Sequence, residues 1–236
     1  MAAQLPQLTE IGERIVLCRA CPRLVKWREE VARVRVRRHR QETYWGRPLP
    51  GFGDPGARLL VVGLAPAAHG GNRTGRMFTG DDSADWLVRE LYEAGFANQP
   101  TSLRDDDGLV LRNAWITAAV RCAPPANRPA AEEIRNCAGF LAEEVASLQP
   151  RVLVALGRIA FDAVSRLARG QGAASSRWRF GHGVRYEMPG PITLLGSYHP
   201  SRQNTQTGRL TREMLRAVFA EAREILREAE ETTGIP

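Results

Sequence analysis

The sequence predicts an α/β protein in which helices cover both faces of a parallel sheet. Four short apolar runs have the pattern of strands buried on both sides, and segments with helical periodicity lie between them. Strands that alternate with helices join in parallel and need a helix layer on each face. With 236 residues, 43% of them hydrophobic, the chain can form one compact domain. We therefore expect a single domain over residues 1–236, with helices and a loop in residues 1–56.

The four predicted strands are continuous apolar runs of strand length. They lie at 58–64 (RLLVVGL), 114–120 (AWITAAV), 151–156 (RVLVAL) and 192–196 (ITLLG). Their carboxyl ends should meet at one edge of the sheet, where open α/β sheets bind ligands. That edge would carry the segments 63–67, 118–125 and 197–201 together with Gly157.

The predicted helices follow from start signals and periodicity. One or two helices are expected over 8–19 and 24–36, interrupted near Pro22, before a loop rich in Gly and Pro at 41–56. The starts of the later helices are marked by acidic residues, by a proline in the first turn, or by a glycine at the entry. These later helices are expected at 81–94, 129–148, 157–168 and 211–231.

Charge patterning favours a polyanionic partner. The net charge is +7, and the segment from Arg19 to Arg40 holds nine basic residues against Glu29 and Glu30. A solvated helix face is the alternative reading of such a run, but the basic balance of the whole chain favours contact with phosphates.

No part of the sequence resembles a membrane or export segment. No apolar run approaches the roughly 18 residues that span a bilayer. The first sixteen residues, MAAQLPQLTEIGERIV, lack a basic segment followed by an apolar stretch. We expect no membrane partner and a cytoplasmic protein, whose cysteines stay reduced or bind metal.

The four cysteines, Cys18, Cys21, Cys122 and Cys137, are the most informative pattern in the chain. Four thiolates at one point select zinc or an iron–sulfur cluster over hard cations. Cys18 and Cys21 are three residues apart, and we expect them on one helical face. Disulfides suit smaller secreted chains, and a thioredoxin-like pair would follow a strand. The alternative to a metal site is four unrelated buried thiols, because free cysteine is often buried.

The loop after the first strand reads GLAPAAHGGNRTGRMFTGD. It contains neither G-x-G-x-x-G nor a Walker lysine, which argues against a dinucleotide or nucleoside triphosphate site. Its backbone N–H groups lie near a strand end, and Phe78 stands between Gly75 and Gly80. An aromatic in this position can stack on a planar base, although an ordinary core phenylalanine fits the loop alone as well.

The loop after the last strand reads SYHPSRQNTQTGR. His199, restricted by Pro200, can donate a hydrogen bond to developing negative charge. The polar residues that follow can meet phosphates or enter a DNA groove; they are Arg202, Gln203, Asn204 and Arg209. Ser197 and Ser201 lie near His199, but no G-x-S-x-G nucleophile elbow is present, so an esterase-like function has little support.

Together these features resemble the uracil-DNA glycosylase superfamily. Gly63-Leu64-Ala65-Pro66-Ala67 and His199-Pro200-Ser201 resemble its two signature motifs. The cysteine spacing is similar to that of its iron–sulfur branches, in which four cysteines hold a [4Fe-4S] cluster. GLAPA together with HPSxxN resembles family 5, the type-B enzymes. The resemblance implies a three-layer α/β/α sandwich and a monomeric, monofunctional glycosylase that flips uracil from DNA, working in the cytoplasm at the nucleoid.

The resemblance also implies roles for individual residues. Phe78 would stack on the flipped base above Gly63, Leu64 and Ala65, and His199 would face the O2 edge of uracil. The loop from Pro200 would press into the duplex, with Arg202 and Gln203 as the wedge. Ser201 and Asn204 belong to the same loop.

Three departures from related families shape the expected mechanism. Ala65 replaces an aspartate, Leu64 replaces a glutamate, and Ala118 falls where a base-reading asparagine would stand. Without that asparagine the site has little with which to reject other bases, so a range including hypoxanthine is implied. Stabilisation of the negative charge on the leaving base can then contribute more to catalysis than a general base. Asp81 is the first candidate to hold the attacking water, although it also fits a helix N-cap, and Asp85 is the second.

A second class of function stays open at this point. A non-catalytic nucleic-acid-binding protein with structural zinc would also explain the basic charge and the four cysteines. Iron with labile sulfide would favour the glycosylase, and stoichiometric zinc would favour the binding protein.

Overall fold

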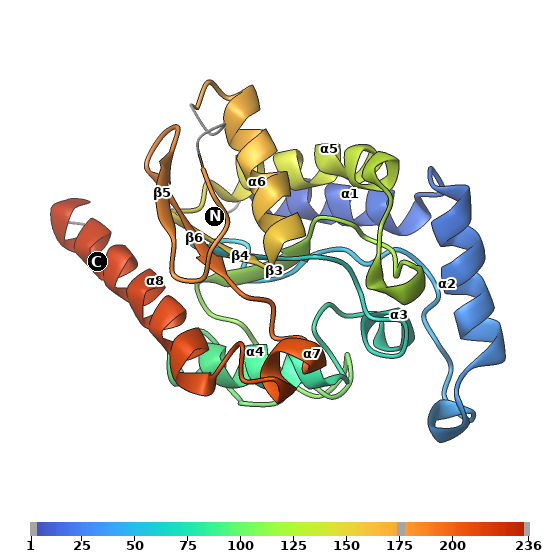
Figure 1. Cartoon of the computed structure of the whole chain (residues 1–236). Coiled ribbons are helices and arrows are strands. Elements are labelled where there is room, and N and C mark those ends of the chain that lie inside the picture. The colour runs from blue at the N-terminus through green and yellow to red at the C-terminus, as the bar shows by residue number, and fades with distance from the viewer. Residues whose placement is uncertain (1–3, 174–177, 234–236) are drawn as a thin grey trace.

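A computed structural model describes residues 4–173 and 178–233, which are built around a six-stranded sheet of order β1-β3-β2-β4-β6-β5 (Figure 1). The four predicted strands form its parallel centre. They are β2 (Leu59–Gly63), β3 (Ala114–Ala118), β4 (Val152–Leu156) and β6 (Ile192–Ser197). Nearly every residue of these strands is buried, as their unbroken apolar runs require.

The expected four-stranded sheet is extended by an antiparallel strand at each edge. β1 (Phe52–Gly53) pairs with β3, and β5 (Arg185–Met188) pairs with β6. β1 lies inside the predicted loop 41–56, because two residues are too few to show periodicity. β5 carries charged, exposed side chains that hide its strand character. The predicted central four-stranded parallel sheet is therefore confirmed, and the two antiparallel edge strands were not predicted.

Helices cover both faces of the sheet, which gives the three expected layers (Figure 1). One face is covered by α1 (Gln4–Leu17), α5 (Ala131–Leu148) and α6 (Arg158–Gly170), and the other by α4 (Asp82–Glu93) and α8 (Arg212–Thr233). Each helix layer packs a separate apolar core against the sheet. Within the described ranges, no helix is both long enough and apolar enough to cross a membrane.

The strand order creates a switch point beside β2. The chain leaves β2 toward β3 on one side and continues through β4 to β6 on the other. Crevices of this kind at the carboxyl edge are the usual ligand sites of open α/β sheets. The short helices α3 (Gly71–Thr74) and α7 (Arg202–Gln206) follow β2 and β6 and lie on the same side of the molecule (Figure 1).

The N-terminal segment differs from the prediction at the first two cysteines. α1 ends at Leu17 and α2 (Pro22–Val34) begins after Cys21, so Cys18 and Cys21 lie in the link between two helices. The expected common helical face is wrong, because Pro22 starts a new helix at a position where its missing N–H costs nothing. The short turns η1 (Arg37–His39) and η2 (Pro125–Asn127) and the helices α3 and α7 were not predicted.

Candidate functional site

The floor of the candidate site is the carboxyl end of β2. Gly63 pairs in register with Ala118 of β3, and both residues are buried. A Cβ atom on Gly63 would lie 2.7 Å from Cε2 of Phe78. The Phe78 ring can therefore rest on this strand end only because residue 63 has no side chain. Leu64 continues the loop and accepts a backbone hydrogen bond from Val120 at 3.0 Å.

Phe78 and His199 come from loops 121 residues apart in the chain and form a ring pair. Their ring centroids are 5.9 Å apart, with an angle of 29° between the ring planes. The backbone of His199 passes close to Gly157, where an added Cβ would lie 3.2 Å from His199 Cβ. The structure thus brings together three of the strand ends that the sequence analysis assigned to one edge.

His199 is a neutral imidazole at ordinary pH. It keeps partial solvent contact, yet burial lowers its pKa from 6.5 to about 4. A neutral imidazole can donate one hydrogen bond without carrying charge of its own. Its backbone is held by Asn204, whose Nδ2 donates to the His199 carbonyl oxygen at 2.9 Å.

The Phe78 loop is held in an unusual backbone conformation. Phe78 itself has φ +47°, a left-handed value that is uncommon for a bulky residue. The buried guanidinium of Arg76 donates to Thr79 Oγ1 at 3.0 Å, to Ser102 Oγ at 3.0 Å and to Asp107 Oδ1 at 2.7 Å. This network fixes the turn that presents the aromatic ring at the sheet edge.

Asp81 caps α4 and turns its second oxygen toward the first motif loop. Its Oδ1 accepts from the backbone N–H groups of Ser83 and Ala84, both at 3.0 Å. A Cβ on Gly70 would lie 2.0 Å from Oδ2, which makes no hydrogen bond to any residue that the structure describes. Burial raises the pKa of Asp81. Asp85 is exposed one turn later, with Asp82, Arg89 and Arg212 as its charged neighbours.

The second motif loop is partly helical, where an irregular loop was expected. Ser201 caps α7 by accepting from the backbone N–H of Asn204 at 3.4 Å. Arg202 and Gln203 are exposed at the first turn of this helix. Arg202 Nε lies 3.8 Å from Asp82 Oδ2, which connects the start of α7 with the start of α4. Both predicted wedge residues therefore stand at the rim of the site.

His182 supports the second motif and was not identified from the sequence. Its Nδ1 accepts from the Tyr198 backbone N–H at 3.2 Å, and the two rings lie 5.3 Å apart. The guanidinium of Arg209 also lies over the Tyr198 ring, 4.7 Å from its centroid. His182 stands in an irregular segment before an exposed strand, so neither periodicity nor a motif marks it.

All four cysteines line one small cavity between α2, α5 and the segment after β3. All are free thiols, and Arg28 Nη1 donates to Cys122 Sγ at 2.8 Å. Burial raises the pKa of the Cys122 thiol to about 11 and raises that of Cys137. These thiols would therefore need a bound cation to remain thiolates at neutral pH.

The four thiols line the cavity without forming a single-ion site in the described part of the chain. Within residues 4–173 and 178–233, no three or more His, Cys, Asp or Glu side chains are placed to hold one metal ion. In a four-iron cluster each cysteine binds a different iron atom, so the thiols surround a volume instead of converging on a point. Ala65 of the first motif packs against the apolar cluster of Leu24, Val120, Cys122 and Cys137, which links this cavity to the loop that follows β2.

A buried ion pair stands beside the cysteine cavity. Arg121, which precedes Cys122, pairs through two nitrogens with Glu144 of α5, and both side chains are at most 2% exposed. Thr117 of β3 donates to Glu144 Oε2 at 2.6 Å. The pair joins the end of β3 to the helix that carries Cys137.

Comparisons with known proteins agree with this architecture. The family model of the uracil DNA glycosylase superfamily matches residues 50–223. A type-5 uracil-DNA glycosylase of Thermus thermophilus is 55% identical over 214 residues, which are 90% of this chain and 95% of that protein. The type-5 enzyme of Pyrobaculum aerophilum is 50% identical over 89% of this chain and 89% of its own length. That of Mycobacterium bovis is 49% identical over 95% of this chain and 84% of its own length.

Proposed function

This chain belongs to the uracil DNA glycosylase superfamily, and we propose that it excises uracil from DNA as a type-5 uracil-DNA glycosylase. The reaction hydrolyses the N-glycosidic bond between base and deoxyribose and begins base excision repair. The observation that carries the proposal is the Phe78–His199 ring pair at the carboxyl edge of the sheet, beside Gly63. We assign the activity to a single domain over residues 1–236, of which residues 1–3, 174–177 and 234–236 lie outside the described part.

The flipped base stacks on Phe78, and His199 stabilises the charge that the base acquires. Cleavage gives an oxocarbenium-like sugar and an anionic base, so a donor at the O2 edge lowers the barrier. The 5.9 Å separation between the ring centroids of His199 and Phe78 supports a role for both residues at the same base. Because its pKa is about 4, His199 acts as a neutral hydrogen-bond donor and not as an imidazolium.

Asp81 holds the attacking water. Neither Leu64 nor Ala65 offers a carboxylate, and Asp81 keeps one oxygen free of hydrogen bonds to described residues while the other caps α4. A carboxylate whose pKa is raised by burial is also a stronger base. Asp85 is a weaker candidate, because it is exposed among the surface charges of α4 and α8.

The base range extends beyond uracil to other deaminated bases, including hypoxanthine. Ala118 closes the floor beside Gly63 with a buried methyl group and offers no side-chain hydrogen bond. A site without a base-specific partner discriminates weakly, because a wrong base leaves no buried polar group unpaired. Arg202 and Gln203 hold the gap in the duplex open from the rim.

Cys18, Cys21, Cys122 and Cys137 would hold a [4Fe-4S] cluster. The cluster would supply a covalent cross-link between three chain segments, and no step of the hydrolysis passes through it. Its ligands lie beside Ala65 of the first motif, so bracing here keeps that loop in place. We further propose that the protein acts as a monomer in the cytoplasm, at the nucleoid.

The direct test is incubation with duplexes that carry uracil, hypoxanthine, xanthine or a thymine mismatch, followed by alkaline cleavage of abasic sites. We expect strand breaks at uracil and, more slowly, at hypoxanthine. An intact uracil strand after prolonged incubation with metal-loaded protein would reject the proposed function. Stoichiometric zinc in such inactive protein would support the non-catalytic alternative.

A further inference from the structure

The arginines of the N-terminal basic run divide into two groups in the structure. The first group is neutralised or buried: Arg19 pairs with Glu29 at 2.6 Å, and Arg33 pairs with Glu30 at 2.6 Å. Arg23 pairs with Glu133 at 2.7 Å, and Arg28 is buried against Cys122. These guanidinium groups have partners within the protein and add little to its outward field.

The second group lies on η1 and the loop after it. Arg37, Arg38, Arg40 and Arg47 are exposed, and none of them has a carboxylate partner among the described residues. Arg35 fixes the turn by donating to the carbonyl oxygens of Ala32 at 3.2 Å and Arg40 at 3.0 Å. We call residues 35–47 the basic arm.

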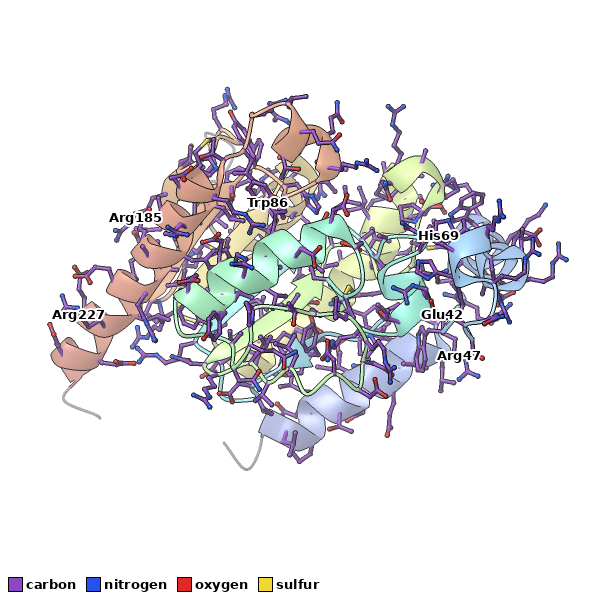
Figure 2. All side chains as sticks on the ribbon, turned by 90° about the horizontal axis from the view of Figure 1, so that it is seen from below. Glu42, Arg47, His69, Trp86, Arg185 and Arg227 are labelled. Atoms are coloured by element: carbon purple, nitrogen blue, oxygen red, sulfur yellow. The ribbon has the colours of Figure 1, made fainter. Side chains whose placement is uncertain are left out.

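The basic arm is attached to the loop that presents Phe78. Glu42 of the arm pairs with Arg73 of α3 and with His39. Arg73 in turn donates to the carbonyl oxygens of His69, at 2.8 Å, and Gly80, at 3.2 Å, on either side of Phe78. Glu42, His69 and Arg47 lie on the same side of the molecule in Figure 2, whereas Arg185 and Arg227 lie at the opposite end.

Trp45 supports Arg47 and is held by contacts of its own, while its side chain stays 38% exposed. A Cβ on Gly75 would lie 3.3 Å from two of its ring atoms, and its Nε1 donates to the Pro48 carbonyl at 3.1 Å. The guanidinium of Arg47 lies over the ring, 5.7 Å from the centroid. The arm therefore presents exposed guanidinium groups without carboxylate partners among the described residues, which suits a contact with phosphates.

We propose that the basic arm binds backbone phosphates of duplex DNA on one side of the flipped nucleotide. The proposal rests on the proposed function, because that function makes DNA the partner. Four guanidinium groups without carboxylate partners match the charge of a duplex, and the planar fork of arginine binds phosphate oxygens in pairs. Binding of this kind is independent of sequence and releases counterions, so its signature is salt dependence.

The test compares two triple variants with equal net charge. The first is Arg37→Gln, Arg38→Gln, Arg40→Gln in the arm. The control is Arg14→Gln, Arg185→Gln, Arg227→Gln, which removes exposed, ion-paired arginines elsewhere. The Kd for a labelled uracil duplex is measured by anisotropy between about 50 and 200 mM salt. We expect the slope of log Kd against log salt to become shallower by about 2–3 in the arm variant, near 0.9 per lost phosphate contact. The control should keep the slope of the unchanged protein.

A second measurement locates the contact. Duplexes truncated on the 5′ or the 3′ side of uracil should differ, because the arm lies on one side of the base site. Truncation on one side should remove the difference in salt slope between the unchanged protein and the arm variant. Truncation on the other side should preserve that difference. Equal slopes in both triple variants would overturn the proposal, as would a difference that survives both truncations. Uracil excision by the unchanged protein and the control tests the proposed function separately.

Discussion

At the residue scale, the site depends on how burial sets the charge state of His199. The folded imidazole has a pKa of about 4, whereas the ordinary value is 6.5. Between these two values the unfolded chain binds a proton that the folded chain does not bind. The contribution of His199 to stability is therefore full above pH 6.5 and is lost as the pH falls toward 4.

This charge state gives a prediction for the pH dependence. The His199→Gln variant cannot titrate at this position, so its unfolding free energy should fall less than that of the parent between pH 6.5 and 4. Urea unfolding at a series of pH values measures the difference. Identical pH profiles for the two proteins would show that His199 does not titrate in this window.

Asp81 can be tested without losing its structural role. Asparagine is as good an N-cap as aspartate, so Asp81→Asn should keep α4 capped and change stability by less than about 1 kcal/mol. The amide cannot accept a proton from water, and we expect single-turnover excision to fall by about 10²-fold. Asp85→Asn is the matched control and should keep the parental rate. Parental excision by Asp81→Asn would leave Asp81 as a cap only.

The residues of the candidate site were predicted unevenly, for physical reasons. Phe78 and His199 follow apolar strands, and the carboxyl ends of parallel strands meet, so their proximity could be expected from the sequence. His182 could not, because it reaches Tyr198 through a tertiary hydrogen bond from an irregular segment. The sequence also could not show which arginines of the N-terminal run have ion-pair partners, because some of those partners are glutamates distant in the chain, such as Glu133 for Arg23.

At the element scale, β3 and α5 are joined by the Arg121–Glu144 pair. Both side chains are almost completely buried, so removal of one partner leaves an uncompensated charge in the interior. Arg121→Met should therefore lower the free energy of unfolding by about 3–5 kcal/mol. Urea unfolding measures the loss.

The matched control for Arg121→Met is the double variant Arg121→Met, Glu144→Leu. It replaces the pair with apolar side chains and should recover most of the stability. If the single variant were as stable as the parent, the charge of Glu144 would have to be solvated, and the structural role given to the pair would be wrong.

Elements were predictable where a long periodic signal exists. The four central strands and the long helices agree with their apolar patterns to within a few residues. β1 and α7 were not predicted, because two and five residues carry no period. The Cys18–Cys21 pair was placed on a helix, whereas Pro22 ends the helical continuity and starts α2.

At the scale of the whole molecule, the cysteine cavity connects three parts of the chain. The link between α1 and α2 supplies two thiols, the segment after β3 supplies one, and α5 supplies one. Binding one group at all four sulfurs would therefore add its binding energy to the folding energy of the whole chain. The apolar contact with Ala65 would carry this bracing to the first motif.

Metal analysis of the intact protein tests this account of the cavity. We expect about four iron and four labile sulfide per chain, with a lower melting temperature after cluster removal. Cys137→Ala should lose iron and melt at a lower temperature. One zinc per chain without sulfide would contradict the cluster, and an unchanged melting temperature after removal would contradict bracing.

The central claim is that the Phe78–His199 ring pair lies at the catalytic site, whereas the cysteines only brace the fold. It is tested most directly by single-turnover excision from a uracil duplex, comparing the parent with the Phe78→Ala, His199→Ala double variant at equal iron content. The account predicts an abasic product from the parent and a rate at least about 10³-fold lower in the double variant, with its iron retained. Equal rates for the two proteins would contradict it.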